Sequence, residues 1–215
     1  MEIRKGTRPG VRAATVLAMG LLATLFGFGS ARAALLQVGD QAPPFSTQAV
    51  ENGQTLPLRL SDFLGHKVVL YFYPRDNTPG CTKEACAFRD GYAKLARWGI
   101  VVLGCSVDSE NSHRAFGQKY KLPFPLLLDP GKQIAKAYGV DNGIPILGLD
   151  KRVTYVIGAD GRILKVYPHV DPALHAAEII HDLGADQAPP TPSPALSATP
   201  AAAGAPADAA HGRGT

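Results

Sequence analysis

Apolar runs and amphipathic stretches alternate along the middle of the chain. Residues 68–73 form a continuous run of apolar, β-prone side chains, which is typical of a central strand covered on both faces. Pro74 ends that run, and a turn follows at 76–80. Apolar residues then recur near helical spacing over 82–97, so we expect a helix that begins around Cys81.

The same alternation continues further along the chain. Buried strands are expected at 100–107 and 124–128, and helices at 110–120, 131–138 and 172–183. Two more strands, at 152–157 and 163–167, are joined by a turn with an Asp-Gly pair, which is a strong hairpin signal. Strands that alternate with helices, with one late antiparallel hairpin, predict an α/β fold: a three-layer sandwich around a central mixed β-sheet.

The first 33 residues have the pattern of a secretory signal peptide. Four basic residues precede an uncharged run at 13–29 that is rich in Leu and Ala. Ala31 and Ala33 supply small residues at positions −3 and −1 of a cleavage point, so we expect cleavage after Ala33. An uncleaved membrane anchor is the alternative, because the apolar run lies at the short end of what spans a bilayer. With cleavage, the mature chain works in the periplasm or another extracytoplasmic space.

The other end of the chain has the composition of a disordered tail. Residues 187–215 contain ten Ala and six Pro, and Leu196 is their only large apolar side chain. Such a segment buries too little surface to offset the entropy lost on ordering, so we expect a disordered Pro/Ala-rich tail. The folded domain is then expected at 34–186, close to the most common domain size.

Charge and cysteine count exclude several classes of protein. The chain of 215 residues has a formal net charge of +4, with 22 Lys and Arg against 18 Asp and Glu. Five of the basic residues and one acidic residue lie within 1–33, so the remainder of the chain is neutral. Nucleic-acid binding and polybasic membrane binding need clustered positive charge and are not expected. Three cysteines are too few for a disulfide-dense scaffold.

The candidate chemistry is concentrated where the first buried strand leads into a helix. Cys81 is expected at the helix N-terminus, where free backbone N–H groups and the positive end of the helix dipole favour a reactive thiolate. Thr78 can aim its hydroxyl at a group beside the sulfur, and Pro74 stiffens the approach and keeps the pocket narrow. A permanent cation would stabilise the thiolate, and Arg152, at the start of a later strand, is the best candidate, although the residues alone do not place it beside Cys81.

The stretch around Cys81 resembles the signature of a known enzyme family. Residues 71–90, YFYPRDNTPGCTKEACAFRD, are similar to the peroxiredoxin signature P-x-x-x-T-x-x-C. The closest likeness is to the peroxiredoxin Q group, also called bacterioferritin comigratory proteins. The flanks at 38–43, 60–65 and 152–161 also resemble the family, and the likeness covers 38–183. A motif of this length is far more specific than a bare C-x-x-C, and it implies the thioredoxin-like version of the α/β fold.

The resemblance implies a role for each candidate residue. Cys81 is then the peroxidatic cysteine, Cys86 the resolving cysteine, and Pro74, Thr78 and Arg152 complete the site. The thiolate of Cys81 attacks a hydroperoxide and becomes a sulfenic acid, which Cys86 converts to a Cys81–Cys86 disulfide. A thioredoxin-type dithiol reduces that disulfide, and no metal or organic cofactor is required. We expect a monomer without stable membrane insertion after signal cleavage.

Four other residues, one after the motif and three within it, have no role that the resemblance requires. Cys105 matches no cysteine that the family requires, and inside an apolar run it is expected to pack as a small buried residue. Glu84, Arg75 and Arg89 either support the site through hydrogen bonds or are solvated.

Two other classes of function stay open. An exported thioredoxin-like disulfide oxidoreductase or copper chaperone would carry C-x-x-C or C-x-x-x-C with a partnering His, whereas this chain has C-x-x-x-x-C. A non-catalytic domain in which Cys81 and Cys86 form a structural disulfide is the other alternative, which an oxidising compartment permits. Consumption of peroxide in the presence of a dithiol reductant separates these classes from a peroxidase.

Overall fold

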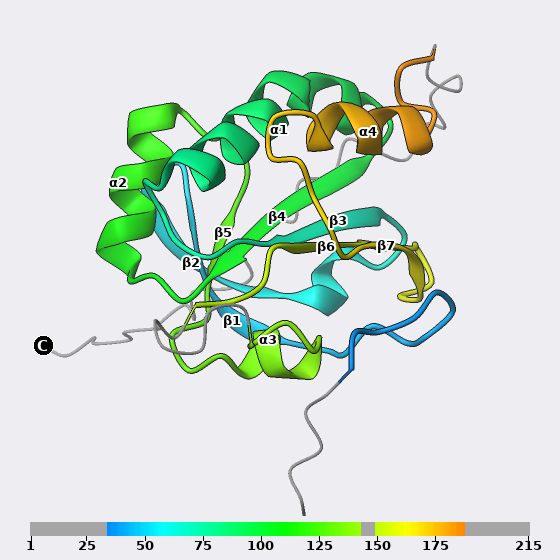
Figure 1. Cartoon of the computed structure of the whole chain (residues 1–215), viewed down its shortest axis with the longest axis horizontal. Coiled ribbons are helices and arrows are strands. Elements are labelled where there is room, and N and C mark those ends of the chain that lie inside the picture. Colours follow the sequence, from blue (N-terminus) through cyan, green and yellow to red (C-terminus); the bar gives the residue numbers. More distant parts are fainter. Residues whose placement is uncertain (1–33, 143–148, 188–215) are drawn as a thin grey trace, which may run out of the picture. The chain divides into compact units, whose positions relative to one another are not determined.

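One seven-stranded mixed sheet forms the centre of the computed structural model, which describes residues 34–142 and 149–187 (Figure 1). The strand order is β2-β1-β5-β4-β3-β6-β7. The strands are β1 (Ser46–Glu51), β2 (Gln54–Arg59), β3 (Lys67–Phe72), β4 (Ile100–Ser106), β5 (Leu126–Leu128), β6 (Val153–Ile157) and β7 (Ile163–Tyr167). The central strands β3, β4 and β5 are parallel, while β6 runs antiparallel to β3 and β7 antiparallel to β6.

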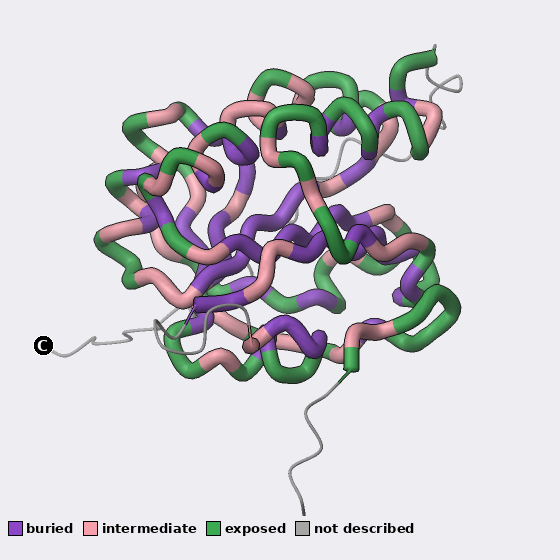
Figure 2. The backbone as a smooth tube through the Cα atoms, in the orientation of Figure 1, coloured by how far each residue is buried: buried purple, intermediate pink, exposed green. Residues whose placement is uncertain are grey.

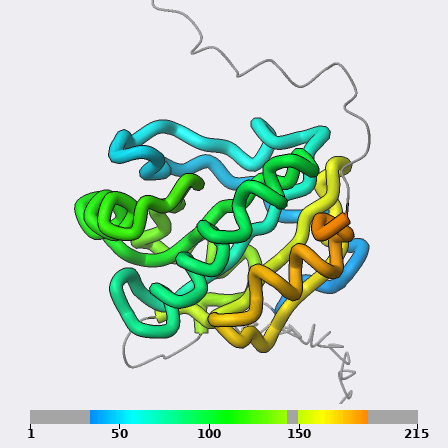
Figure 3. The backbone as a smooth tube through the Cα atoms, turned by 90° about the horizontal axis from the view of Figure 1, so that it is seen from above, coloured from blue at the N-terminus to red at the C-terminus, as the bar shows by residue number. Residues whose placement is uncertain are grey.

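Helices cover both faces of this sheet. The helices are α1 (Pro79–Arg97), α2 (Glu110–Tyr120), α3 (Gln133–Ala137) and α4 (His175–Asp182), with a short 3₁₀ turn η1 (Leu60–Phe63). Helices α1, α2 and α4 pack on one face, where α1 and α4 lie side by side, and α3 and η1 pack on the other (Figures 1 and 3). The expected thioredoxin-like three-layer sandwich is therefore confirmed.

Strand β3 shows why the sheet needs two covering layers. Its alternate side chains enter two separate hydrophobic clusters, with Val69 and Tyr71 on the side of α1 and Leu70 and Phe72 on the side of α3. All four are fully buried, which is why the strand is an unbroken apolar run in the sequence (Figure 2).

Several boundaries differ from the sequence-based expectations. Helix α1 begins at Pro79 rather than around Cys81, because the fixed φ of proline suits the first helical position. Helix α4 begins at His175 rather than at 172, and α3 and β5 are each shorter than expected. The hairpin of β1 and β2 was not predicted, since the edge strand β2 contains Pro57 and alternates poorly. Its turn uses Asn52 and Gly53, both at positive φ.

The predicted signal segment at 1–33 and nearly all of the predicted tail lie outside the described residues. Within 34–142 and 149–187, no helix is both long and apolar enough to cross a membrane.

Candidate active site

Cys81 is the third residue of α1, directly after the loop that leaves β3. Thr78 is the N-cap of the helix, with extended backbone angles of φ −82° and ψ 151°, and Pro79 occupies the first helical position. Because the first N–H groups of a helix have no acceptor within the helix, the start of α1, where Cys81 lies, carries positive partial charge. Cys81 itself is only 1% exposed, so its thiol lies at the bottom of the site rather than on the surface.

Arg152 reaches this sulfur from the neighbouring strand. Strand β6 lies antiparallel beside β3 with Val153 opposite Phe72, so the residue before β6 lies next to the loop that follows β3. The Arg152 guanidinium Nη2 donates to Cys81 Sγ at 3.1 Å. Its other terminal nitrogen, Nη1, forms an ion pair with Glu84 Oε2. One planar cation therefore bridges the thiol and a carboxylate, which the fork geometry of arginine permits.

Glu84 is one of three residues of the motif that the sequence could not assign. It lies in α1 one turn after Cys81 and is fully buried. Its Oε2 binds Arg152, while its Oε1 has no hydrogen-bond partner among residues 34–142 and 149–187. Burial raises the pKa of the Glu84 carboxyl to about 7, although Arg152 acts in the opposite direction. Of the three candidate supporting residues, Glu84 is the one that contacts the site.

This raised pKa predicts how pH changes the stability of the fold. Glu84 has an ordinary pKa of 4.5 and a folded-state pKa of about 7, so between these values the folded chain holds the proton more tightly than the unfolded chain. The contribution of Glu84 is thus complete below pH 4.5 and is lost as pH rises through about 7. Relative to Glu84→Gln, the wild type is expected to lose about 3 kcal/mol of unfolding free energy across this window. Denaturant unfolding of both proteins measures it, and a constant difference would contradict the prediction.

Thr78 and Pro74 both lie in the loop that leads from β3 into α1. The Thr78 hydroxyl donates to the backbone oxygen of Arg75 at 3.0 Å. Since its proton is used within the loop, this hydroxyl has only its oxygen left, as a hydrogen-bond acceptor. Pro74 lines a cavity of about 430 Å³ together with Arg152, Leu35 and Pro168. This cavity gives a small molecule access to the guanidinium that touches the sulfur.

Cys86 lies on the same helix as Cys81 but not in the same pocket. It is partly exposed in a groove of about 640 Å³ between α1 and α4, beside Lys83 and Ala176. All three cysteines are free thiols. The structure therefore places Cys81 and Cys86 within one helix without joining them.

Cys105, Arg75 and Arg89 all lie away from the Cys81 sulfur. Cys105 is fully buried in β4, within the hydrophobic cluster on the α3 side of the sheet, so its packing role is confirmed, and burial raises the pKa of its thiol. Arg75 is largely exposed, 3.9 Å from Asp108. Arg89 pairs with Asp90 at 2.8 Å and donates to a backbone oxygen of α2. Neither arginine contacts Cys81.

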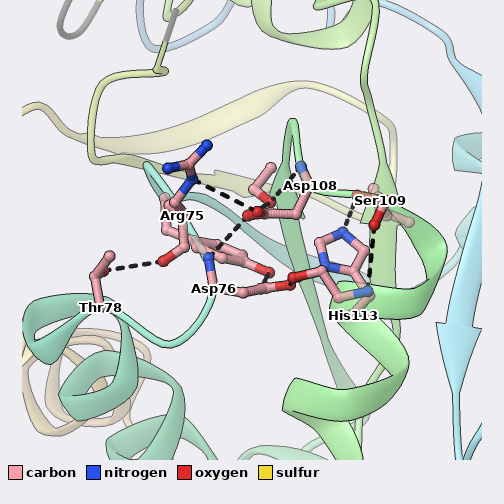
Figure 4. A network of polar contacts seen from close by, with 10 residues as sticks. Arg75, Asp76, Thr78, Asp108, Ser109 and His113 are labelled. Carbon is pink, nitrogen blue, oxygen red and sulfur yellow. Dashed lines mark hydrogen bonds and ion pairs between the residues drawn. The ribbon is translucent and has the colours of Figure 1, made fainter. Parts of the chain in front are cut away.

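A buried polar pair behind the loop was missed by the sequence reasoning (Figure 4). His113 Nδ1 lies 2.9 Å from Asp76 Oδ2, and both side chains are almost completely buried. The available signal was the spacing of His113 and Phe116, which share the buried face of α2. A lone histidine on an apolar face gives no indication of its partner, so this signal alone could not lead to Asp76.

Known proteins share the sequence and the fold of this chain. The sequence profile of the AhpC/TSA family matches residues 38–166. The chain is 48% identical over 129 residues to the chloroplastic peroxiredoxin Q of Sedum lineare, covering 60% of this chain and 67% of the relative. It is 38% identical over 153 residues to peroxiredoxin Bcp of Bacillus subtilis (strain 168), covering 69% and 95%. The crystal structure of peroxidoxin BcpB from Mycobacterium tuberculosis matches with a TM-score of 0.63 at 33% identity, covering 71% of this chain and 99% of the other.

The thioredoxin-like fold and the arginine-bound thiol, together with these relatives, define a thiol-dependent peroxidase, an enzyme of the oxidoreductase class. The chain belongs to the AhpC/TSA family, and the relatives it resembles are Bcp and peroxiredoxin Q proteins.

Proposed function

We propose that this enzyme reduces hydrogen peroxide and organic hydroperoxides with the thiolate of Cys81. The observation that carries the proposal is the 3.1 Å contact between Arg152 Nη2 and Cys81 Sγ at the start of α1. A guanidinium cannot lose its proton, so it favours the anionic sulfur and remains charged when negative charge moves to a leaving oxygen. The residues of the site supply this chemistry without a metal or an organic cofactor.

The first step transfers one oxygen atom to sulfur. The Cys81 thiolate attacks one oxygen of the hydroperoxide, so an S–O bond forms while the O–O bond breaks, and the sulfur is oxidised to a sulfenic acid. Thr78 accepts a hydrogen bond from the peroxide O–H, and Arg152 and the Cys81 backbone N–H stabilise the leaving oxygen. That oxygen takes a proton and departs as an alcohol or water.

The second and third steps return the enzyme to its thiol form. The sulfur of Cys86 attacks the sulfenic sulfur, which forms a Cys81–Cys86 disulfide and releases water. A thioredoxin-type dithiol then supplies two electrons by thiol–disulfide exchange and is itself oxidised to a disulfide.

Two cysteine variants test the proposed function. With a dithiol reductant, the wild type is expected to consume hydroperoxide over many turnovers, because each cycle regenerates the Cys81 thiol. Cys81→Ser is expected to consume none, and Cys86→Ser is expected to consume one equivalent when the dithiol is left out, because it reacts once but cannot close the disulfide. The measurement is peroxide remaining per mole of enzyme, with Cys105→Ser as the control that keeps wild-type turnover. A wild type that reduces protein disulfides but consumes no peroxide would show that the function is wrong.

We propose that residues 1–33 direct export and are removed after Ala33, so that the mature chain has no stable membrane insertion. We also propose that the mature chain is a monomer. The support is the basic start, the apolar run and the small residues before the cleavage point. Sequencing the N-terminus of the chain from an extracytoplasmic fraction is expected to begin at Ala34. Recovery of the chain in the membrane with its first residues intact would contradict cleavage and support the anchored alternative.

A further inference from the structure

The loop that carries Thr78 is hydrogen-bonded to residues that follow β4 and to residues of α2. At its start, the backbone N–H of Asp76 donates to Asp108 Oδ2 at 2.8 Å, and Asp108 in turn accepts from Ser106 at the end of β4 (Figure 4). Thr78 follows Asp76 by only two residues. The position of Asp76 therefore constrains the position of Thr78, which is the N-cap of α1.

The side chain of Asp76 is the centre of this network. Its Oδ1 accepts from the Tyr73 hydroxyl at 2.8 Å, and its Oδ2 accepts from the Ser112 hydroxyl at 2.7 Å and faces His113 Nδ1 at 2.9 Å. Asp76 is 5% exposed, and His113 is fully buried. A buried carboxylate with this many donors is held in one orientation, because loss of any donor leaves a buried charge less well satisfied.

His113 has acceptors on both sides of its ring. Its Nδ1 faces the Asp76 carboxylate, and its Nε2 lies 3.1 Å from the backbone oxygen of Leu127 in β5. A carbonyl oxygen can only accept, so Nε2 donates to it, and the contact between Nδ1 and the Asp76 carboxylate is a second hydrogen bond. The ring thus ties the active-site loop to the central sheet through two hydrogen bonds that point in opposite directions.

We propose that His113 is a positioning residue for the peroxidase reaction: through Asp76 it fixes the loop so that Thr78 meets the peroxide oxygen at the correct place. His113 touches neither Cys81 nor the cavity beside Arg152. Its effect is therefore specific to a reaction that needs Thr78. The inference rests on the proposed peroxidase function.

Two substitutions of the same histidine separate positioning from general packing. His113→Asn places an amide N–H near the position of Nδ1, so it keeps the bond to Asp76 and loses the bond to Leu127. His113→Gln reaches the position of Nε2, so it keeps the bond to Leu127 and loses the bond to Asp76. Both variants remove the ring, so a merely structural role would affect them alike.

The measurement compares two reactions of Cys81. In each variant, one rate is that of oxidation by hydroperoxide, and the other is that of alkylation by iodoacetamide, which does not need a positioned peroxide. His113→Gln is expected to slow oxidation about tenfold while alkylation changes less than about twofold. His113→Asn is expected to restore oxidation to within about threefold of wild type.

Two results would overturn the inference. One is equal oxidation rates in the two variants, and the other is a loss of alkylation that parallels the loss of oxidation. If His113→Gln fails to fold, the double variant Tyr73→Phe with Ser112→Ala removes two donors from Asp76 and keeps the histidine. It is expected to slow oxidation alone, and an unchanged rate would refute the inference. Absence of peroxide consumption by the wild type would instead refute the proposed function.

Discussion

Replacement of Arg152 by lysine is expected to slow the reaction of Cys81 with hydroperoxide by at least about tenfold, or about 1.4 kcal/mol of transition-state stabilisation. In the wild type, one terminal nitrogen of the guanidinium contacts the sulfur and the other binds Glu84. A lysine ammonium keeps the positive charge but is a single point, so it cannot hold both groups in their present geometry. Stopped-flow mixing of the reduced enzyme with hydroperoxide gives the rate directly.

A second arginine supplies the matched control for this experiment. Arg162, in the turn between β6 and β7, donates to the backbone oxygen of Gly39 and lies on the exposed surface. Arg162→Lys makes the same chemical change far from the sulfur and is expected to leave the rate unaltered. If the folded Arg152→Lys protein reacts as fast as the wild type, Arg152 is not the cation that the reaction uses.

Closure of the Cys81–Cys86 disulfide is expected to require α1 to open at its start. The helix runs without interruption from Pro79 to Arg97 and contains both cysteines. Residues five apart in an ideal helix are separated by about 7.5 Å along the axis and about 140° around it. A disulfide accommodates Cα separations up to about 6.8 Å, so the bond cannot form across the intact helix. Helix ends open at the lowest cost, which makes the first turns the part that unwinds.

Hydrogen exchange on the two redox forms measures this opening. Amides of residues 82–88 are expected to be protected in the reduced enzyme and to exchange faster by an order of magnitude or more in the disulfide form. Cys86→Ser treated with one equivalent of peroxide is the control, since it is oxidised but keeps its helix. Equal protection in both forms would contradict the prediction. A Cys81–Cys105 bridge found by mass mapping would show that Cys105, and not Cys86, is the resolving cysteine. Such a bridge is not expected, because Cys81 and Cys105 lie in clusters on opposite faces of the sheet.

The sequence was sufficient for elements whose signals are local. Helix α2 was predicted at its observed bounds, and in the structure the Ser109 side chain caps its start. The strands β6 and β7 were found from their Asp-Gly turn. Strand β2 was missed because its residues are mostly exposed and gain their order from pairing with β1, which is a contact that the local pattern does not contain.

In the candidate site too, some residues are placed by local sequence and others only by contacts between distant segments. Cys81 and Thr78 belong to one continuous motif, and the structure keeps them at the start of one helix. Arg152 arrives through the pairing of β6 with β3, and His113 through the packing of α2 behind the loop. Those contacts join residues separated by 71 and 37 positions. Only the fold brings them together, so their roles could not be worked out from spacing.

Because both cysteines lie in α1, the opening of this helix also sets the lifetime of the oxidised Cys81. In the proposed cycle, the sulfenic acid of Cys81 persists until the helix opens, and during that interval a second peroxide molecule competes with Cys86 for the same sulfur. Capture by peroxide gives a sulfinic acid, which the dithiol cannot reverse. The peroxide concentration that inactivates the enzyme is therefore set by how readily the first two turns of α1 unwind. A substitution that stabilises the first turns of α1 would therefore also lower the peroxide concentration at which the enzyme is inactivated.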